Sequence, residues 1–364
     1  MSASVRPLYF LAAWSLLFGL VLWLFPPAES AGADPEITRA VSLMHRSVEA
    51  IRRYRDENGP AIDARFDLNR TGLVGMETSP ITTSLGHLEA KRTTTNPQFA
   101  GAVVRMFREA GLKPGDRVAV GASGSFPGLI LAALCAAEAM DLHPLVISSL
   151  GASNWGGNHP EWTWHEMSVC LRQAGVLDIE PLAFSLGGDG DFGADMTAEG
   201  RDILERKILA SGRPFLRPKD LPSGVAARLA HFGEAAGGGQ VQAFVNIGGS
   251  FIDMGTDGEI LKLRPGYNPA ADVVIPPVER RGLIQEMARQ GVPVIHLLYV
   301  KGLCDRYGLP WDPVPLPDPD ASDSLPGLSP RPTVLIVYLA GMIFGLAWIA
   351  RTNSRFGKKF PETE

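Results

Sequence analysis

The chain has 364 residues, of which 45% are hydrophobic and 20% are charged, and its formal net charge at pH 7 is −5. This length can hold one large domain or two modest ones, and the composition excludes a chain that is disordered throughout. The three cysteines, Cys135, Cys170 and Cys304, have neither CxxC nor Cys/His metal spacing. We therefore expect them to be small core side chains, and we expect no metal site built on cysteine.

Two apolar stretches without a single charge lie near the ends of the chain. Residues 8–25 and 333–350 each contain 18 residues, or about 27 Å of helix, which is just enough to cross the hydrocarbon core of a bilayer. We therefore expect two transmembrane helices. Arg6 precedes the first stretch, and Arg351, Arg355, Lys358 and Lys359 follow the second. These basic residues predict that both ends are cytoplasmic and that the central segment is outside.

This interpretation gives a two-pass protein of the inner or plasma membrane with a large extracytoplasmic domain. Its parts are a cytoplasmic N-terminus (1–7), a transmembrane helix (8–25), a linker (26–35), the α/β domain (36–311), a Pro-rich linker (312–332), a transmembrane helix (333–350) and a basic cytoplasmic tail (351–364). One alternative stays open. The first apolar stretch could be a signal peptide that is cleaved near Ala28-Glu29-Ser30.

The central segment reads as an alternation of helices and strands. Residues 37–55 have apolar positions three or four apart, which predicts an amphipathic helix, and residues 98–110 predict a second helix. Beyond residue 116 we expect strands at 118–120, 144–149, 180–185, 241–247 and 294–296, and helices at 129–140, 162–174, 197–210, 223–235 and 277–290. This pattern predicts an α/β fold, a three-layer domain with a mostly parallel sheet that is covered on both faces.

The stretch Gly121-Ala122-Ser123-Gly124-Ser125 joins the first of these strands to a helix that opens at Pro127. Such a junction directs unpaired backbone N–H groups and the positive end of a helix dipole at one spot, which suits an anion. It matches neither GxGxxG nor a P-loop, and Ser125 stands where a nucleophile elbow would have its last glycine. A close-packed turn, an anion site, and a nucleophile at Ser123 or Ser125 all remain open.

Other polar loops follow the expected strands, at the edge where open α/β sheets bind ligands. We predict ligand contacts from Gly121, Ser123, Gly124, Ser125, Asn154, Gly188, Asn246, Gly248, Gly249 and Ser250. Residues 73–97 add a long polar segment in which Lys91 and Arg92 precede three threonines. These cations and hydroxyls form a candidate carboxylate or phosphate site, to which Arg70 could contribute, whereas a purely structural role as a helix cap is the alternative.

Catalytic chemistry is predicted less sharply. Ser123, His159 and Asp189 supply the residue types of a hydrolytic triad, although the sequence does not bring them together. Asp189 and Asp191 form an Asp-x-Asp pair that could hold a divalent cation, but the EF-hand pattern is incomplete, and solvated turn aspartates are the alternative. His159 and His165 lack HExxH spacing, so zinc has little support. The sequence leaves the cofactor unknown, and we assign no metal ligand.

Five motifs in this order resemble the poly-gamma-glutamate system protein family over residues 36–309. They are TGLVGMETSPITTSLGHLEAKRTTTNP, DRVAVGASGSFPGLILA, SLGASNWGGNHPEWTW, SLGGDGDFG and VNIGGSFIDMG. The resemblance implies a membrane-anchored component of the machinery that makes or exports the poly-γ-glutamate capsule. It implies the polymer and the synthase or export membrane proteins as partners, and it assigns no catalytic residue.

The charge balance limits how such a polymer could bind. Residues 34–330 contain 28 Lys and Arg against 36 Asp and Glu, a net charge of −8, so the domain as a whole repels a polycarboxylate. Binding would need a local site, and no basic stripe or nucleic-acid motif is visible. Three functions remain open: an accessory protein that binds the polymer or the synthase, an amide hydrolase or transferase acting on the polymer, and a structural scaffold.

Overall fold

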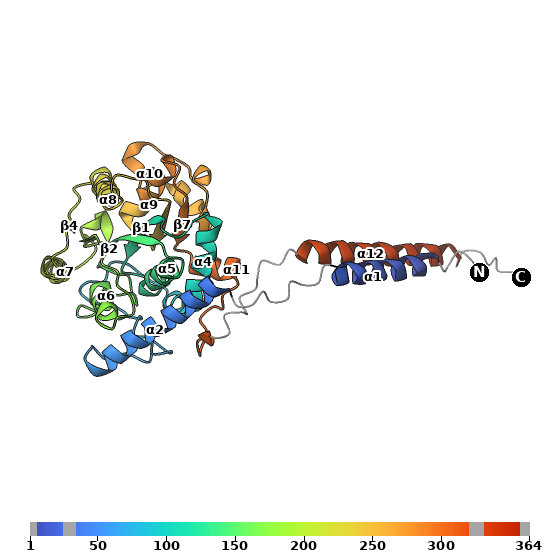
Figure 1. Ribbon diagram of the computed structural model, residues 1–364, viewed down its shortest axis with the longest axis horizontal. Helices are drawn as coiled ribbons and strands as arrows, with labels where there is room; N and C mark the ends of the chain where they lie inside the picture. The colour runs from blue at the N-terminus through green and yellow to red at the C-terminus, as the bar shows by residue number, and fades with distance from the viewer. Residues whose placement is uncertain (1–5, 25–33, 320–330, 357–364) are drawn as a thin grey trace, which may run out of the picture. The chain divides into compact units, whose positions relative to one another are not determined.

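The computed structural model describes residues 6–24, 34–319 and 331–356 (Figure 1). These residues divide into two compact units, one made of the described residues between 33 and 325 and one made of the two terminal helices. The large unit contains a seven-stranded sheet in the order β4-β3-β2-β1-β5-β7-β6. Its strands are β1 (Arg117–Ser123), β2 (His143–Ser149), β3 (Ala183–Ser185), β4 (Phe215–Leu216), β5 (Ala243–Ile247), β6 (Gly266–Asn268) and β7 (Val294–Leu297).

The predicted α/β fold with a mostly parallel sheet is confirmed. All neighbouring strands run parallel except β6, which pairs antiparallel with β7 at one edge. Strand β1 has buried side chains from Val118 onward on both faces, as its continuous run of small and apolar residues requires at the centre of a parallel sheet. The sequence did not predict β4 or β6, because strands of two or three residues are too short to show a pattern.

Helices cover both faces of the sheet, which makes the domain three-layered. One face packs under α2 (Pro35–Glu57), α4 (Gln98–Glu109), α5 (Pro127–Ala139), α6 (Trp164–Gln173) and α11 (Val300–Tyr307). The other lies under α8 (Leu221–Ala235), the short α9 (Phe251–Met254) and α10 (Leu283–Arg289), and α7 (Ala198–Ala210) closes a third, smaller core. Figure 1 shows α2, α5 and α6 on one side of the sheet and α8 and α10 on the other.

Local sequence explains where several helices begin. Asp34 caps α2, since its side chain accepts hydrogen bonds from the backbone of Glu36 and Ile37, and Pro35 takes the first helical position. Thr163 and Glu166 form a capping box on α6. The helix predicted over 277–290 is wrong at its start: α10 begins only at Leu283, after a short 3₁₀ turn.

The segment 73–97, for which a functional loop and a structural role both remained open, contains one short helix, α3 (Leu88–Thr93). The loop before it reaches the end of the sheet, where the Thr82 backbone forms a bridge with Ala152, just after β2. The three cysteines are buried and free, as predicted for core side chains.

The terminal unit consists of α1 (Arg6–Leu24) and α12 (Arg331–Phe356), which pack against each other. The indole N–H of Trp14 donates to the Tyr338 carbonyl oxygen over 3.2 Å, and Gly341 leaves room for the Trp14 ring. Within the part of the chain that the structure describes, no helix combines the length and apolar character needed to span a bilayer. The two predicted transmembrane helices therefore have no support from the structure.

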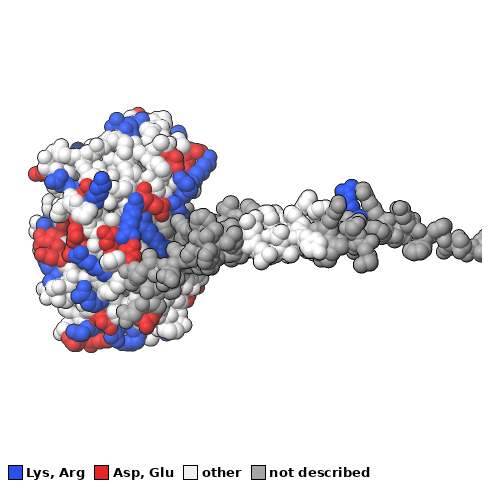
Figure 2. Space-filling model, turned by 45° about the vertical axis from the view of Figure 1, so that its right-hand side comes forward, with Lys and Arg blue, Asp and Glu red and all other residues white. Residues whose placement is uncertain are grey.

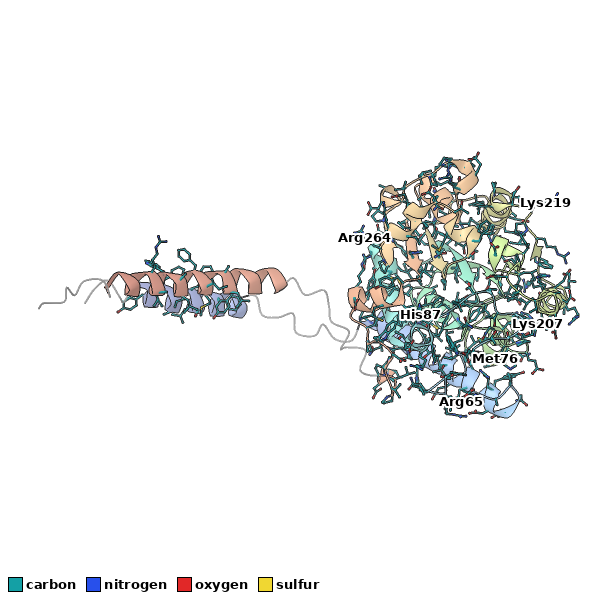
Figure 3. All side chains as sticks on the ribbon, turned by 180° about the vertical axis from the view of Figure 1, so that it is seen from behind. Arg65, Met76, His87, Lys207, Lys219 and Arg264 are labelled. Atoms are coloured by element: carbon teal, nitrogen blue, oxygen red, sulfur yellow. The ribbon has the colours of Figure 1, made fainter. Side chains whose placement is uncertain are left out.

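The surface of the large unit carries both signs of charge. Lys and Arg are interspersed with Asp and Glu over the face that Figure 2 shows. Arg65, Lys219 and Arg264 are exposed and extend from the periphery of the domain (Figure 3). An anionic polymer would therefore meet both signs of charge on that face.

Candidate functional site

A cavity of about 750 Å³ lies at the edge of the sheet where the parallel strands end. It sits at the point where the strand order reverses, since the chain leaves β1 for β2 on one side and later places β5 on the other. Open α/β sheets bind ligands at this position. Its lining comes from the segment 83–91 and from the ends of β1, β2, β3, β5 and β7 with the loops that follow them. The lining includes Thr83, Ser84, His87, Glu89, Lys91, Ser123, Ser125, Phe126, Ser149, Ser153, Gly188, Asp189, Asp195, Gly249, Ser250, Tyr299, Lys301 and Trp311.

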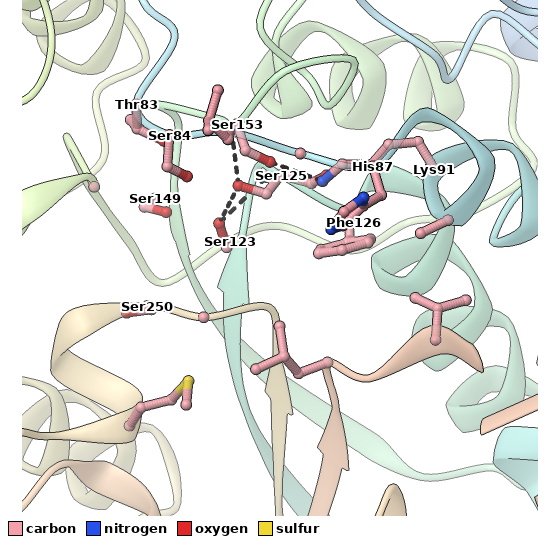
Figure 4. A pocket seen from close by; sticks show the side chains of 18 of the residues that line it. Thr83, Ser84, His87, Lys91, Ser123, Ser125, Phe126, Ser149, Ser153 and Ser250 are labelled. Carbon is pink, nitrogen blue, oxygen red and sulfur yellow. Dashed lines mark hydrogen bonds between the residues drawn. The ribbon is translucent and has the colours of Figure 1, made fainter. Parts of the chain in front are cut away.

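The interior of the cavity is rich in hydroxyl groups, as Figure 4 shows. Ser123 is the last residue of β1, Ser125 follows that strand, and Ser153 follows β2. The Ser123 hydroxyl donates to Ser125 Oγ over 2.9 Å, and the Ser153 backbone N–H donates to the same oxygen over 3.0 Å. The three serines therefore form one hydrogen-bonded row at the end of the two central strands.

Lys91 from α3 reaches this row, although it is only 4% exposed. Its Nζ donates to the Ser125 carbonyl oxygen over 2.5 Å and to Ser153 Oγ over 2.8 Å, and it lies 3.5 Å from the centre of the Phe126 ring. No carboxylate among the described residues pairs with it. Burial without a counter-charge lowers the pKa of Lys91 to about 7, so its charge changes near neutral pH.

The rim adds apolar surface and three acids. Leu85, Tyr299 and Trp311 line the cavity with exposed side chains. The carboxylates of Glu89, Asp189 and Asp195 also line it, and burial raises the pKa of Asp195. Lys301 lies on the rim but forms an ion pair with Asp305 at 2.6 Å. The cavity therefore has a polar floor, an apolar rim and no surplus of positive charge.

The structure brings together only some of the residues predicted to bind a ligand. Those that line the cavity are Lys91, Ser123, Ser125, Gly188, Gly249 and Ser250, with Asp189 from the catalytic candidates. Arg92 does not line it, because its guanidinium binds both carboxylate oxygens of Asp312. Arg70 forms an ion pair with the exposed Asp56, outside the cavity.

Four further candidates serve the framework of the cavity instead of its lining. Gly121 makes room for Asp253, because a Cβ there would lie 2.7 Å from both of its carboxylate oxygens. A Cβ on Gly124 would meet the Ser149 and Leu150 carbonyl oxygens, and one on Gly248, which has φ +88°, would meet the Ser123 side chain. Asn154 ties the loop after β2 to the segment 77–86.

Asn246 is buried in β5 and makes contacts inside the sheet edge. Its amide donates to the Gly248 carbonyl oxygen over 2.9 Å, and it lies 3.0 Å from Nδ1 of His296. Burial lowers the pKa of His296 to about 4, so this imidazole is neutral at physiological pH. The pair fixes the turn after β5, and neither residue lines the cavity.

The predicted triad does not assemble. His159 is half-buried, accepts a hydrogen bond from the Glu161 backbone at Nδ1, and does not line the cavity that holds Ser123 and Asp189. The Asp-x-Asp hypothesis is also not supported, since Asp191 turns into the protein to pair with Arg228. Among the described residues, no three His, Cys, Asp or Glu side chains converge as a metal site would require.

Sequence reasoning missed Ser153, whose hydroxyl lies 2.8 Å from Lys91 Nζ. Its signal was available but weak: it is a small hydroxyl residue that follows a predicted strand, beside the candidate Asn154. No family model, curated protein or solved structure matches this chain, so its fold and its candidate site rest on the structure alone.

Proposed function

We propose that the cavity binds carboxylate-bearing segments of poly-γ-glutamate, and that the protein is a membrane-anchored component of the system that makes or exports this polymer. The observation that carries the proposal is the convergence of five strand-end loops, a row of serines and a buried lysine on one cavity. Hydroxyl groups and an ammonium are hydrogen-bond donors suited to carboxylate and amide oxygens. The motifs of the resemblance supply most of the lining of this cavity, whereas Asp195 and the residues after β7 lie outside them.

Several features favour a local binding site in the cavity over a general electrostatic attraction between the domain and the polymer. The domain has a net charge of −8, and the cavity carries three rim carboxylates, so the long-range field opposes a polyanion. The donors must therefore act at short range. Two of the three Lys91 donors bind Ser125 and Ser153, which leaves one for a ligand oxygen when the amine is protonated. The first turn of α5, which has no side-chain cap, also begins at this cavity.

The pH dependence of binding tests the proposal. The carboxylates of the polymer remain ionised between pH 6 and pH 8, whereas Lys91 gains its charge as the pH falls through about 7. We expect short poly-γ-glutamate oligomers to bind the full-length chain up to about tenfold more tightly at pH 6 than at pH 8. Isothermal titration calorimetry at both values of pH measures the difference.

A matched pair of variants isolates the cavity. Lys91→Met should weaken binding at pH 6 and remove its pH dependence, while Lys219→Met removes an equal charge at an exposed position outside the cavity and should leave both unchanged. Equal loss in the two variants would mean that the polymer responds only to net charge. Absence of saturable binding would favour the scaffold alternative.

We also retain the membrane anchor and the synthase or export proteins as proposed partners. The support for the anchor is the absence of charge from residues 8–25 and 333–350, together with apolar side chains that α1 and α12 leave exposed, such as Leu16, Ile343 and Phe344. The alternative function, an amide hydrolase or transferase acting on the polymer, has lost its predicted triad. The contact between Ser153 and Lys91 supports this alternative instead.

A further inference from the structure

Lys91 has the surroundings of a base and not those of a structural ion. A structural lysine is normally exposed or paired with a carboxylate, since burying an unpaired ammonium is costly. Lys91 is 4% exposed, and its partners are a carbonyl oxygen, a hydroxyl and an aromatic ring, all of them neutral. An uncharged amine fits this environment, because it can donate to the Ser125 carbonyl oxygen while its lone pair accepts the Ser153 hydroxyl proton.

Ser153 is placed to use that lone pair. Its Oγ lies 2.8 Å from Lys91 Nζ, and both residues line the cavity (Figure 4). A nucleophile and its base need this hydrogen-bond distance and access to the substrate. Ser123 lacks the first condition, because its hydroxyl donates to Ser125 Oγ instead of to a base.

We propose that Ser153 is a nucleophile, with Lys91 as its general base, in a site that cleaves or transfers amide bonds. The proposal rests on the proposed function only for the identity of the substrate, a γ-linked polyglutamate amide. Ser125 completes the site. Its Oγ accepts hydrogen bonds from the Ser153 backbone and from Ser123, so its own hydrogen can donate to a developing oxyanion.

The chemical steps balance with water as the co-reactant. Ser153 Oγ attacks the amide carbonyl carbon and its proton passes to Lys91 Nζ. The C–N bond then breaks, and the leaving amine takes that proton, which leaves an ester on Ser153 and a neutral Lys91. Water attacks the ester with Lys91 again as base, releasing a carboxylic acid and regenerating Ser153; an incoming amine in place of water gives transfer.

A fluorophosphonate probe, which phosphonylates activated serines, tests the chemistry on the full-length chain without a known substrate. We expect one adduct per chain, mapped to Ser153 by peptide mass spectrometry. Its rate should rise about tenfold from pH 6 to pH 8 as Lys91 loses its proton. This direction is opposite to the one expected for polymer binding, so the two roles of Lys91 are separable.

Four variants distinguish a catalytic pair from a structural contact. Ser153→Ala should abolish the adduct, and Lys91→Met should slow it by about a hundredfold or more and flatten the pH profile. Ser168→Ala, on α6 outside the cavity, and Lys219→Met should label as the unaltered chain does. Circular dichroism and thermal unfolding check that each variant is folded, and Ser153→Ala keeps the test valid if Lys91→Met does not fold.

The outcomes separate this inference from the proposed function. Polymer binding without an adduct, or an adduct at another serine, overturns the Ser153–Lys91 pair and leaves the binding proposal intact. An adduct on Ser153 that poly-γ-glutamate neither blocks nor competes with, in a chain that does not bind the polymer, supports the pair and overturns the ligand. Release of free amine from the polymer, lost in Ser153→Ala, supports both.

Discussion

At the scale of single residues, Gly121 is required by a buried acid, Asp253, and not by a ligand. The side chain of Asp253 is enclosed beneath β1, and its Oδ1 has no hydrogen-bond partner among the described residues. Burial raises the pKa of Asp253 to about 6, and the Asp191 charge adds to this effect while Arg228 opposes it. Gly121 was predicted to contact a ligand, but it provides the space for this carboxyl group.

Asp253 should therefore make the stability of the protein fall as the pH rises. The unfolded carboxyl loses its proton near pH 4, whereas the folded one holds it until about pH 6, so its contribution is present below pH 4 and lost through pH 6. A shift of this size corresponds to about 3 kcal/mol. We expect the free energy of unfolding of Asp253→Asn, relative to the unaltered chain, to rise by about that amount between pH 4 and pH 7.5. Urea denaturation measures it, and a constant difference across this range would contradict the prediction.

At the scale of secondary-structure elements, a buried ion pair joins α8 to the loop after β3. Arg228 and Asp191 lie 2.7 Å apart with 4% and 2% of their side chains exposed, and Ser185 Oγ donates to the same carboxylate over 2.7 Å. Removing one partner of such a pair leaves an unpaired buried charge, which is more costly than never having had the pair.

Arg228→Met should lower the free energy of unfolding by about 3–5 kcal/mol. The double variant with Asp191→Asn should recover a substantial part of that loss, because Asp191→Asn removes the carboxylate charge that Arg228→Met leaves unpaired. Chemical denaturation of the two single variants and the double variant completes the cycle. If the losses of unfolding free energy in the two single variants sum to the loss in the double variant, the two side chains act independently. The ion pair would then not be what holds α8 to this loop.

The elements also show where sequence patterns succeed. The period of α2 places Ile37, Val41, Met44, Val48 and Ile51 in the core, as predicted, because one face of a long amphipathic helix repeats many times. In contrast, α3 spans six residues, too few for a period to emerge. The helix that carries Lys91 was therefore not predicted, although Lys91 itself was named as a candidate.

At the scale of the whole molecule, the orientation of the large domain is a prediction that the chain itself allows to be tested. The cysteines Cys135, Cys170 and Cys304 are buried, so the background reaction with a maleimide should be low. Lys219→Cys should react with a membrane-impermeant maleimide in intact cells if the domain is outside. Lys358→Cys, in the tail outside the described residues, should react only after permeabilisation. Reaction of neither position before permeabilisation would place the domain in the cytosol.

The sequence alone determined the three-layer architecture and the edge of the sheet at which a site should form. Both follow from local properties: apolar runs define buried strands, periodic stripes define covering helices, and parallel strands must all end at the same edge. Only the tertiary structure decided which polar residues meet there. Arg92 binds Asp312 instead of lining the cavity, and His159 lies outside the cavity. Ser153 contacts Lys91, although the two residues are 62 positions apart in the sequence. The partners of a side chain depend on distances between loops that are far apart in the chain, and no local pattern encodes those distances.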